Sequence, residues 1–298
     1  MTDATSFGKA ADLYHRGRPD YPPEAVEWLL PAEARVVADV GAGTGKLTAA
    51  IAGTGRQVIA VDPDEAMLRA LAEQYEGVEL LPNSGDGNGP HANTGEHPGT
   101  GPGHNADHHH NFGRQRDLER RPAITALVGT AERLPLADRS VDAVTFAQAW
   151  HWADPDVASQ EAARVLRPGG VLGLVWNIRD TNVPWVARFN AIVHHSAAER
   201  MIDADQVRIG PPLTEVERHT IAWTYRLDAD TLVHLAASRS AVIALADAQR
   251  AEVLDEVRAL ADEQADDDGA VHLPYRTHLY RAVLRQDAHH GGQPRAGG

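Results

Sequence analysis

Residues 36–45, with the sequence VVADVGAGTG, constrain the fold more than any other part of the chain. The first five form an apolar run broken only by Asp39, which is typical of a strand buried on both faces of a parallel sheet. Three glycines at alternate positions follow, and residues 45–52 are predicted to form a helix. A glycine turn between a buried strand and a helix lets a ligand approach the backbone, and the helix N-terminus offers unpaired N–H groups. The segment therefore predicts an α/β fold with a ligand site at this turn.

Apolar runs and amphipathic stretches alternate along the rest of the chain. Strands are predicted at residues 57–61, 124–128, 143–146 and 171–176, and helices at 24–30, 63–75 and 155–166, the last followed by a turn at 167–170. Such alternation is typical of a doubly wound α/β sheet. Beyond residue 183 the chain is predicted to be more helical, with helices at 232–245 and 250–263 and a closing strand or hairpin at 271–284.

Two stretches do not follow this alternation. Residues 83–121 and 286–298 are rich in Gly, Pro and His and contain little to bury, so they cannot offset the entropy of ordering. They are predicted to be a disordered insertion and a disordered tail. The predicted organisation is a leader at 1–35, a ligand-binding core at 36–183, and a helical cap with closing strands of the same domain at 184–285.

Composition excludes several classes of function. The chain has 28 Lys and Arg against 42 Asp and Glu, a net charge of −14, which argues against nucleic acid or an anionic membrane as the main partner. It has no cysteine, so disulfides, thiolate zinc sites and a Cys nucleophile are excluded. The first residues do not resemble a signal peptide, and the longest apolar stretch is far too short for a membrane span. The default expectation is a cytoplasmic protein.

The glycine turn distinguishes three classes of ligand. A nucleotide P-loop is disfavoured, because Val40 stands where its first Gly belongs and Leu47 where its Ser or Thr belongs. The dinucleotide pattern G-x-G-x-x-G is weakened, because its last Gly is Lys46. The third class is S-adenosylmethionine. Its methyltransferases carry G-x-G-x-G with an acidic residue two positions before the first Gly, and Asp39 stands at that position.

Asp62 ends the second predicted strand, 21 residues after Gly41. A carboxylate at this position can accept hydrogen bonds from both hydroxyl groups of a ribose. The alternative is that Asp62 caps the next helix, since Pro63 suits the first helical position. The two roles are compatible.

Several motifs in order resemble those of class I S-adenosylmethionine-dependent methyltransferases. The chain is most similar to their small-molecule branch, the type 11 or trans-aconitate methyltransferase-like proteins. The resemblance rests on the leader, the glycine motif, Val61-Asp62 and three later segments: residues 129–136 (GTAERLPL), 148–152 (QAWHW) and 164–170 (RVLRPGG). In the first of these three segments Thr130 replaces the usual Asp, so backbone groups at Ala131 are the expected contact to the adenine.

The resemblance implies a seven-stranded, mostly parallel sheet with the cofactor across the carboxyl ends of its strands and a helical partial cap over the substrate. It implies S-adenosylmethionine as the cofactor. His108, His109 and His110 invite a metal interpretation, but because they lack spaced ligands in a folded element they predict only an incidental affinity, and no metal site is expected. The expected cofactor-binding residues are Asp39, Gly41, Ala42, Gly43, Gly45, Asp62, Pro63, Thr130, Ala131 and Gln148, with Tyr14 and Arg18 closing over the methionine end.

Methyl transfer from a sulfonium is an in-line displacement, in which positioning supplies much of the catalysis. A base is needed only where the acceptor must lose a proton. His151 is the candidate base. If it acts as one, the rate of methyl transfer should rise with pH through an ordinary histidine pKa. The alternative is that Trp150, His151 and Trp152 form a packing wall. Trp152, Asn177 and Arg179 are candidate substrate residues. Arg179 would hold a substrate carboxylate bidentately, or form a salt bridge with Asp180 or another acid.

The sequence keeps two other functions open. One is an NAD(P)-dependent oxidoreductase on a related fold, and the other is a cofactor-binding protein without activity. The main expectation is a methyltransferase (EC 2.1.1.-) acting on a small-molecule acceptor. The sequence does not specify which acceptor this is, which of its atoms is methylated, or the oligomeric state of the protein.

Overall fold

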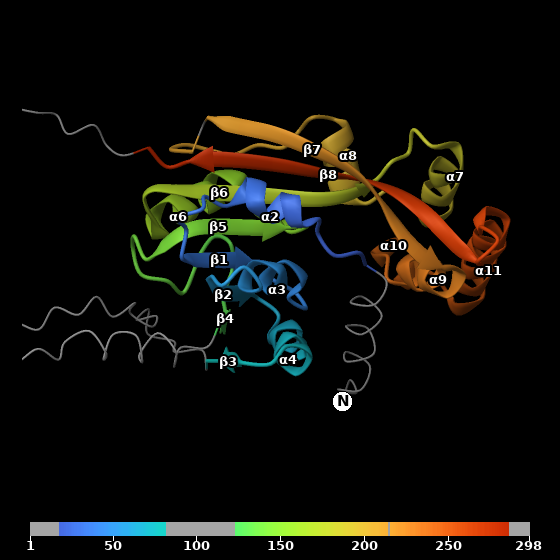
Figure 1. Ribbon diagram of the computed structural model, residues 1–298, viewed down its shortest axis with the longest axis horizontal. Helices are drawn as coiled ribbons and strands as arrows, with labels where there is room; N and C mark the ends of the chain where they lie inside the picture. Colours follow the sequence, from blue (N-terminus) through green and yellow to red (C-terminus); the bar gives the residue numbers. More distant parts are fainter. Residues whose placement is uncertain (1–17, 82–122, 214, 286–298) are drawn as a thin grey trace, which may run out of the picture.

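A computed structural model describes residues 18–81, 123–213 and 215–285 (Figure 1). Tyr14, the predicted insertion at 83–121 and the predicted tail at 286–298 lie outside the described residues.

The described residues contain a single mixed sheet. In chain order its strands are β1 (Val36–Val40), β2 (Gln57–Asp62), β3 (Val78–Leu80), β4 (Ile124–Val128), β5 (Val141–Ala147), β6 (Leu166–Arg179), β7 (Val216–Asp228) and β8 (Ala270–Val283). Their order across the sheet is β3-β4-β2-β1-β5-β6-β8-β7. The strands from β3 to β6 pair in parallel, and β8 pairs antiparallel with β6 and β7.

The predicted α/β class and the mostly parallel, doubly wound sheet are confirmed. The described sheet has eight strands instead of the expected seven, because Val78–Leu80 pairs with β4 and adds a short edge strand. β1 occupies the middle of the parallel part, with β2 on one side and β5 on the other. The carboxyl ends of β1 and β5 therefore meet where the strand order reverses, which is where open α/β sheets bind ligands.

Helices cover both faces of the parallel strands. In chain order the helices of the described residues are α2 (Pro23–Leu29), α3 (Lys46–Ala52), α4 (Glu65–Gln74), the short 3₁₀ helix η1 (Trp150–Trp152), α6 (Pro155–Val165), α7 (Pro184–Val193), α8 (Ala197–Asp203), α9 (Ala229–Ala237), α10 (Ser240–Ile243) and α11 (Asp247–Gln264). Successive strand residues point to opposite faces, so Val37 packs with α2, α3 and α4 while Ala38 packs with α6. This alternation builds two apolar layers around the sheet.

The expected cap at 184–285 differs from its prediction in one long element. Residues 216–228 form β7, the edge strand of the sheet, instead of continuing a helical region. Helices α9, α10 and α11 connect β7 to β8, and with α7 they bury a third apolar cluster against the far end of these two strands. In Figure 1 this helical group stands beyond the end of the parallel sheet.

Two further boundaries differ from the predictions. The turn expected at residues 167–170 is the irregular beginning of β6, where the pairing with β5 shifts register between Val141 and Ala143. The helix expected at 232–245 is divided into α9 and α10 at Ser238, whose hydroxyl donates to the Leu235 carbonyl oxygen.

Candidate active site

The glycine turn after β1 exposes backbone to a cavity. Gly41, Gly43 and Gly45 have φ angles of 68°, 55° and 86°, in the left-handed region that favours glycine. A Cβ atom at Gly41 would collide with Ala149, and one at Gly45 would lie 2.7 Å from Leu71 of α4, whereas the space around Gly43 is open. Gly41 and Gly43 line the cavity and Gly45 does not. Residues 41–44 and the start of α3 thus face the cavity, while Gly45 allows close packing against α4.

Asp39 is buried beneath this turn. Its two carboxylate oxygens accept hydrogen bonds from the hydroxyls of Thr48 in α3, at 2.6 Å, and Thr145 in β5, at 3.0 Å. Burial raises the pKa of Asp39 to about 6, against the lowering effect of both hydroxyl groups. The side chain is 0% exposed, so the expected direct contact with the cofactor is not available to it. Asp39 positions the turn by joining three elements below it.

Asp62 lies beside the turn with its carboxylate directed at the backbone. Its Oδ2 accepts from the Gly43 N–H at 2.8 Å and its Oδ1 from the Asp64 N–H at 2.9 Å. Burial raises the pKa of Asp62, and these two N–H groups oppose the rise. The helix cap of α4 is Asp64, which accepts from the Ala66 N–H, so the capping alternative for Asp62 is wrong. Pro63 is exposed and does not line the cavity.

Thr130 and Ala131 follow β4 in a tight turn. The N–H of Thr130 donates to the Arg133 carbonyl oxygen at 3.4 Å, and the reverse bond measures 3.2 Å. The Gly129 N–H donates to the backbone carbonyl oxygen of Asp62 at 3.2 Å, which keeps the turn next to the end of β2. Neither expected adenine-side residue lines the cavity, and Thr130 is exposed.

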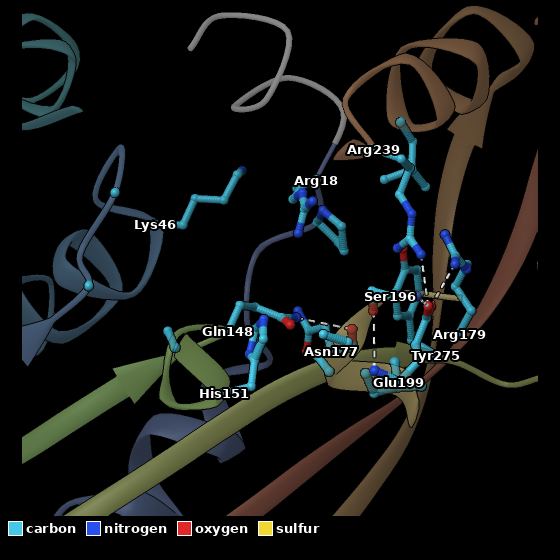
Figure 2. A pocket seen from close by; sticks show the side chains of 18 of the residues that line it. Arg18, Lys46, Gln148, His151, Asn177, Arg179, Ser196, Glu199, Arg239 and Tyr275 are labelled. Atoms are coloured by element: carbon cyan, nitrogen blue, oxygen red, sulfur yellow. Dashed lines mark hydrogen bonds and ion pairs between the residues drawn. The ribbon is translucent and has the colours of Figure 1, made fainter. Parts of the chain in front are cut away.

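A cavity of about 630 Å³ lies at the carboxyl ends of β1, β5 and β6, within the size range of small-molecule sites. It brings together nine of the predicted residues: Arg18, Gly41, Ala42, Gly43, Gln148, His151, Trp152, Asn177 and Arg179. Figure 2 shows Gln148, His151 and Asn177 together and Arg179, Glu199 and Arg239 as a second group, with Arg18 above and between the two. The six predicted residues that do not line it are Asp39, Gly45, Asp62, Pro63, Thr130 and Ala131.

His151 lies in η1, immediately after β5, at the wall of the cavity. Burial and the nearby charge of Arg18 lower its pKa to about 4, whereas the sequence predicts an ordinary histidine value. The imidazole is therefore neutral at neutral pH. Its Nδ1 is buried and has no hydrogen-bond partner among the described residues. The ring is able to accept a proton or a hydrogen bond from a ligand, but it does not titrate near pH 6.5.

The two tryptophans beside His151 have different surroundings. Trp150 is buried, packs edge-on against Phe146 at 4.8 Å between ring centroids, and donates its indole N–H to the Arg208 carbonyl oxygen at 2.8 Å. Trp152 is 76% exposed, and its ring lies 4.8 Å from that of His151. The wall interpretation fits Trp150, while Trp152 leaves an aromatic face at the rim of the cavity.

Gln148 and Asn177 connect strands at the cavity floor. The Gln148 side-chain amide donates to the Asn177 carbonyl oxygen at 3.0 Å. The Asn177 amide donates to the Asp20 carbonyl oxygen at 3.2 Å and its Oδ1 accepts from Thr277 at 2.7 Å. Because both ends of its side chain bind protein groups, Asn177 holds β6, β8 and the N-terminal segment together.

Arg179 is a buried residue with an acidic partner. Its Nη2 donates to Glu199 Oε1 at 2.6 Å and to the side-chain oxygen of Asn190. The salt-bridge alternative is therefore present, with Glu199 in place of Asp180. Burial and the charge of Arg239 lower the pKa of Arg179 to about 10, so the guanidinium stays charged at neutral pH.

Sequence reasoning missed several cavity residues, above all Glu199, Arg239 and Lys46. The pair Ser196 and Glu199 forms a capping box at the start of α8, and this S-x-x-E pattern is the signal that would have located the helix. No sequence signal places Arg239 beside Glu199, 40 residues earlier, because their contact depends on how α8 and α9 fold onto the sheet.

The described residues contain no group of three or more His, Asp and Glu side chains arranged to hold a metal ion. In the same part of the chain, no helix combines the length and the apolar character needed to cross a membrane.

Comparison with known proteins identifies the family. Residues 37–88 and 104–174 each match a family model of a methyltransferase domain. Over 282 residues the chain is 41% identical to the uncharacterized methyltransferase Rv3342 of Mycobacterium tuberculosis, which covers 94% of this chain and 96% of the relative. The chain belongs to the class I S-adenosylmethionine-dependent methyltransferases.

Two more distant comparisons agree with this assignment. The methyltransferase is 32% identical over 185 residues, 60% of its length and 55% of the relative, to the uncharacterized methyltransferase C25B8.09 of Schizosaccharomyces pombe. A solved structure from Anaeromyxobacter dehalogenans, described as a type II methyltransferase, has the same fold with a TM-score of 0.59 at 21% identity, covering 90% of this chain and 98% of that one. An NAD(P)-dependent oxidoreductase or an inactive cofactor-binding protein is not favoured.

The cofactor of this family is S-adenosylmethionine, and the residues of the site fit it. Open space around Gly43 admits a ligand to the backbone. Each carboxylate oxygen of Asp62 accepts one hydrogen bond from the described residues and has capacity for a second, as ribose hydroxyls require.

Proposed function

We propose that this methyltransferase acts on a small-molecule acceptor bound in the cavity beside the glycine turn. The observation that carries the proposal is the cavity itself: about 630 Å³, with the backbone of Gly41 and Gly43 at one end and charged side chains at the other. A space of this size suits a cofactor end and a small acceptor. The net charge of −14 gives a nucleic acid little attraction.

The residues of the site divide into two proposed groups. Gly41, Ala42, Gly43 and Asp62 bind the cofactor, with Gln148 and Arg18 near its reacting end. The acceptor lies between His151, Trp152 and Arg179, which line the remainder of the cavity.

When bound, S-adenosylmethionine would supply an electrophilic methyl group to a lone pair of the acceptor, and its sulfur would keep the electrons of the broken carbon–sulfur bond. The protein holds the acceptor in line and excludes water, and such positioning supplies up to ~7–11 kcal/mol in well-oriented systems. Where the acceptor must lose a proton, the neutral His151 ring with its unpartnered Nδ1 is the group that accepts it.

The first test is cofactor binding. Dialysed protein titrated calorimetrically should bind S-adenosylhomocysteine and should not bind NAD. Protein incubated with methyl-labelled S-adenosylmethionine and a size-fractionated cell extract should then transfer label to the low-molecular-weight fraction. Label found only in protein or nucleic acid would overturn the small-molecule assignment, and Asp62→Ala serves as the negative control for transfer.

A further inference from the structure

The end of the cavity away from the glycine turn carries an unusual excess of positive charge. Arg179 and Arg239 both donate to one carboxylate, that of Glu199, at 2.6 and 2.7 Å. Arg239 comes from the connection between α9 and α10, Arg179 from the end of β6 and Glu199 from α8, and all three line the cavity (Figure 2). We call Arg179 and Arg239 the arginine cluster.

Glu199 does not neutralise this cluster. Burial raises the pKa of Glu199, but the two arginines outweigh burial and lower it to about 2, so its single negative charge faces two guanidinium groups. An excess of buried positive charge is costly unless an anion compensates it.

The arginines also retain hydrogen-bond donors. The side chain of Arg179 is only 2% exposed, yet its buried Nε has no hydrogen-bond partner among the described residues. Arg239 makes its hydrogen bonds within the described residues, to Glu199 and to the His194 carbonyl oxygen, through Nη2 alone. A guanidinium with an open edge matches the paired oxygens of a carboxylate or phosphate.

The position of Glu199 is itself fixed. Its Oε2 accepts the Ser196 N–H at 2.6 Å in the capping box of α8, and the Ser196 hydroxyl accepts the Glu199 N–H. The carboxylate therefore holds both arginines in place from a rigid helix start, which lowers the entropy lost when they bind a ligand.

We propose that the arginine cluster binds an acid group, carboxylate or phosphate, of the methyl acceptor, and that Arg239 determines this preference. The proposal rests on the function proposed above, since it assigns the acceptor of that same cavity to a chemical class: small anions.

The test measures binding of simple anions to protein saturated with S-adenosylhomocysteine. In a calorimeter, succinate and inorganic phosphate are the probes, and succinamide is the uncharged control. At least one anion should bind in a saturable way and more weakly as salt is added, while succinamide should not bind. The stronger of the two anions identifies the acid group. If neither anion binds, the proposal is wrong.

Arg239→Gln should weaken anion binding about ten- to a hundredfold and leave S-adenosylhomocysteine binding unchanged. The matched control is Arg188→Gln, which removes an arginine paired with a glutamate at 2.7 Å outside the cavity, and should change neither affinity. Arg239→Lys, which keeps the charge and loses the planar edge, provides a second variant if Arg239→Gln does not fold, and should weaken binding to a smaller extent.

Equal anion affinity in the parent and the Arg239 variants, or an equal loss in Arg188→Gln, would overturn the assignment. Failure of S-adenosylhomocysteine to bind, with anion binding still dependent on Arg239, would instead contradict the proposed function and leave the anion site standing.

Discussion

Asp62 is the single residue on which the proposed cofactor site depends most. Asp62→Ala removes a carboxylate that would accept charged hydrogen bonds, each worth roughly 1.5–3 kcal/mol. We expect about a ten- to a hundredfold loss of S-adenosylhomocysteine affinity, measured by calorimetry. Asp64→Ala is the control, because Asp64 caps α4 and should lower the melting temperature without changing affinity. A folded Asp62→Ala variant that binds as tightly as the parent would refute the assignment.

His151 requires a different test from the one that its sequence suggests. With its pKa lowered to about 4, the ring is neutral from pH 5.5 to 8, so the parent rate should be flat in this range whether or not His151 accepts a proton. The decisive measurement is the kinetics of His151→Asn.

We expect His151→Asn to raise the Michaelis constant with little change in the maximal rate, because an acceptor that is already ionised at neutral pH needs no base. Binding of S-adenosylhomocysteine should stay close to that of the parent. A maximal rate lowered by roughly 10²–10⁴, with an unchanged Michaelis constant, would instead establish His151 as a general base.

At the scale of elements, Asp39 joins β1 to α3 through Thr48 and to β5 through Thr145. Its folded pKa of about 6 lies above the unfolded value of 3.8, so protonation favours the folded state and this contribution is lost as pH rises through 6. The free energy of unfolding of the parent, compared with that of Asp39→Asn, should therefore fall as the pH rises from 4 to 7.

Urea unfolding of both proteins at several pH values in that range measures this difference. Asp142→Asn is the control in that range. Burial would raise the pKa of Asp142, but its hydrogen bonds and Arg167 outweigh burial and lower it, so its stabilising contribution is constant from pH 4 to 7 and is lost only below pH 4. A parent–variant difference for Asp39 that does not change with pH would show that its carboxyl group is not perturbed.

At the scale of the whole molecule, residues 83–121 separate β3 from β4. The last residue of β3, Leu80, pairs with Ala126 of β4, and β4 begins two residues earlier at Ile124. Two residues along the strand and one spacing between strands separate Leu80 from Ile124 by a distance on the order of 10 Å. Deleting residues 86–118 keeps 82–85 and 119–122, which span up to roughly 26 Å when extended.

We expect this deletion to leave the melting temperature and the S-adenosylhomocysteine affinity almost unchanged, since closure entropy depends weakly on loop length. Thermal unfolding and calorimetry of the shortened chain provide the measurements. A large loss of either quantity would mean that the deleted residues contribute to the folded domain.

Local sequence patterns are enough to predict the parallel strands and the glycine turn after β1. Val36–Val40 and Ile124–Val128 form the predicted strands to the residue, because a short run that is apolar in all but one position suits a strand covered on both faces. Gly41 and Gly43 follow at once, and their positive φ angles belong to glycine wherever the rest of the chain lies. These are local properties of short segments.

β7 was missed although Ile221, Trp223, Tyr225 and Leu227 alternate along it, because a single partly exposed face gives a weaker signal than a buried strand. The tertiary structure alone decided three further features of the site: that Asp39 is covered, that His151 is too buried to titrate near neutral pH, and that Arg239 meets Arg179 across Glu199. Burial and long-range charge pairs depend on which segments meet in space, and the spacing of residues along a chain does not contain that information.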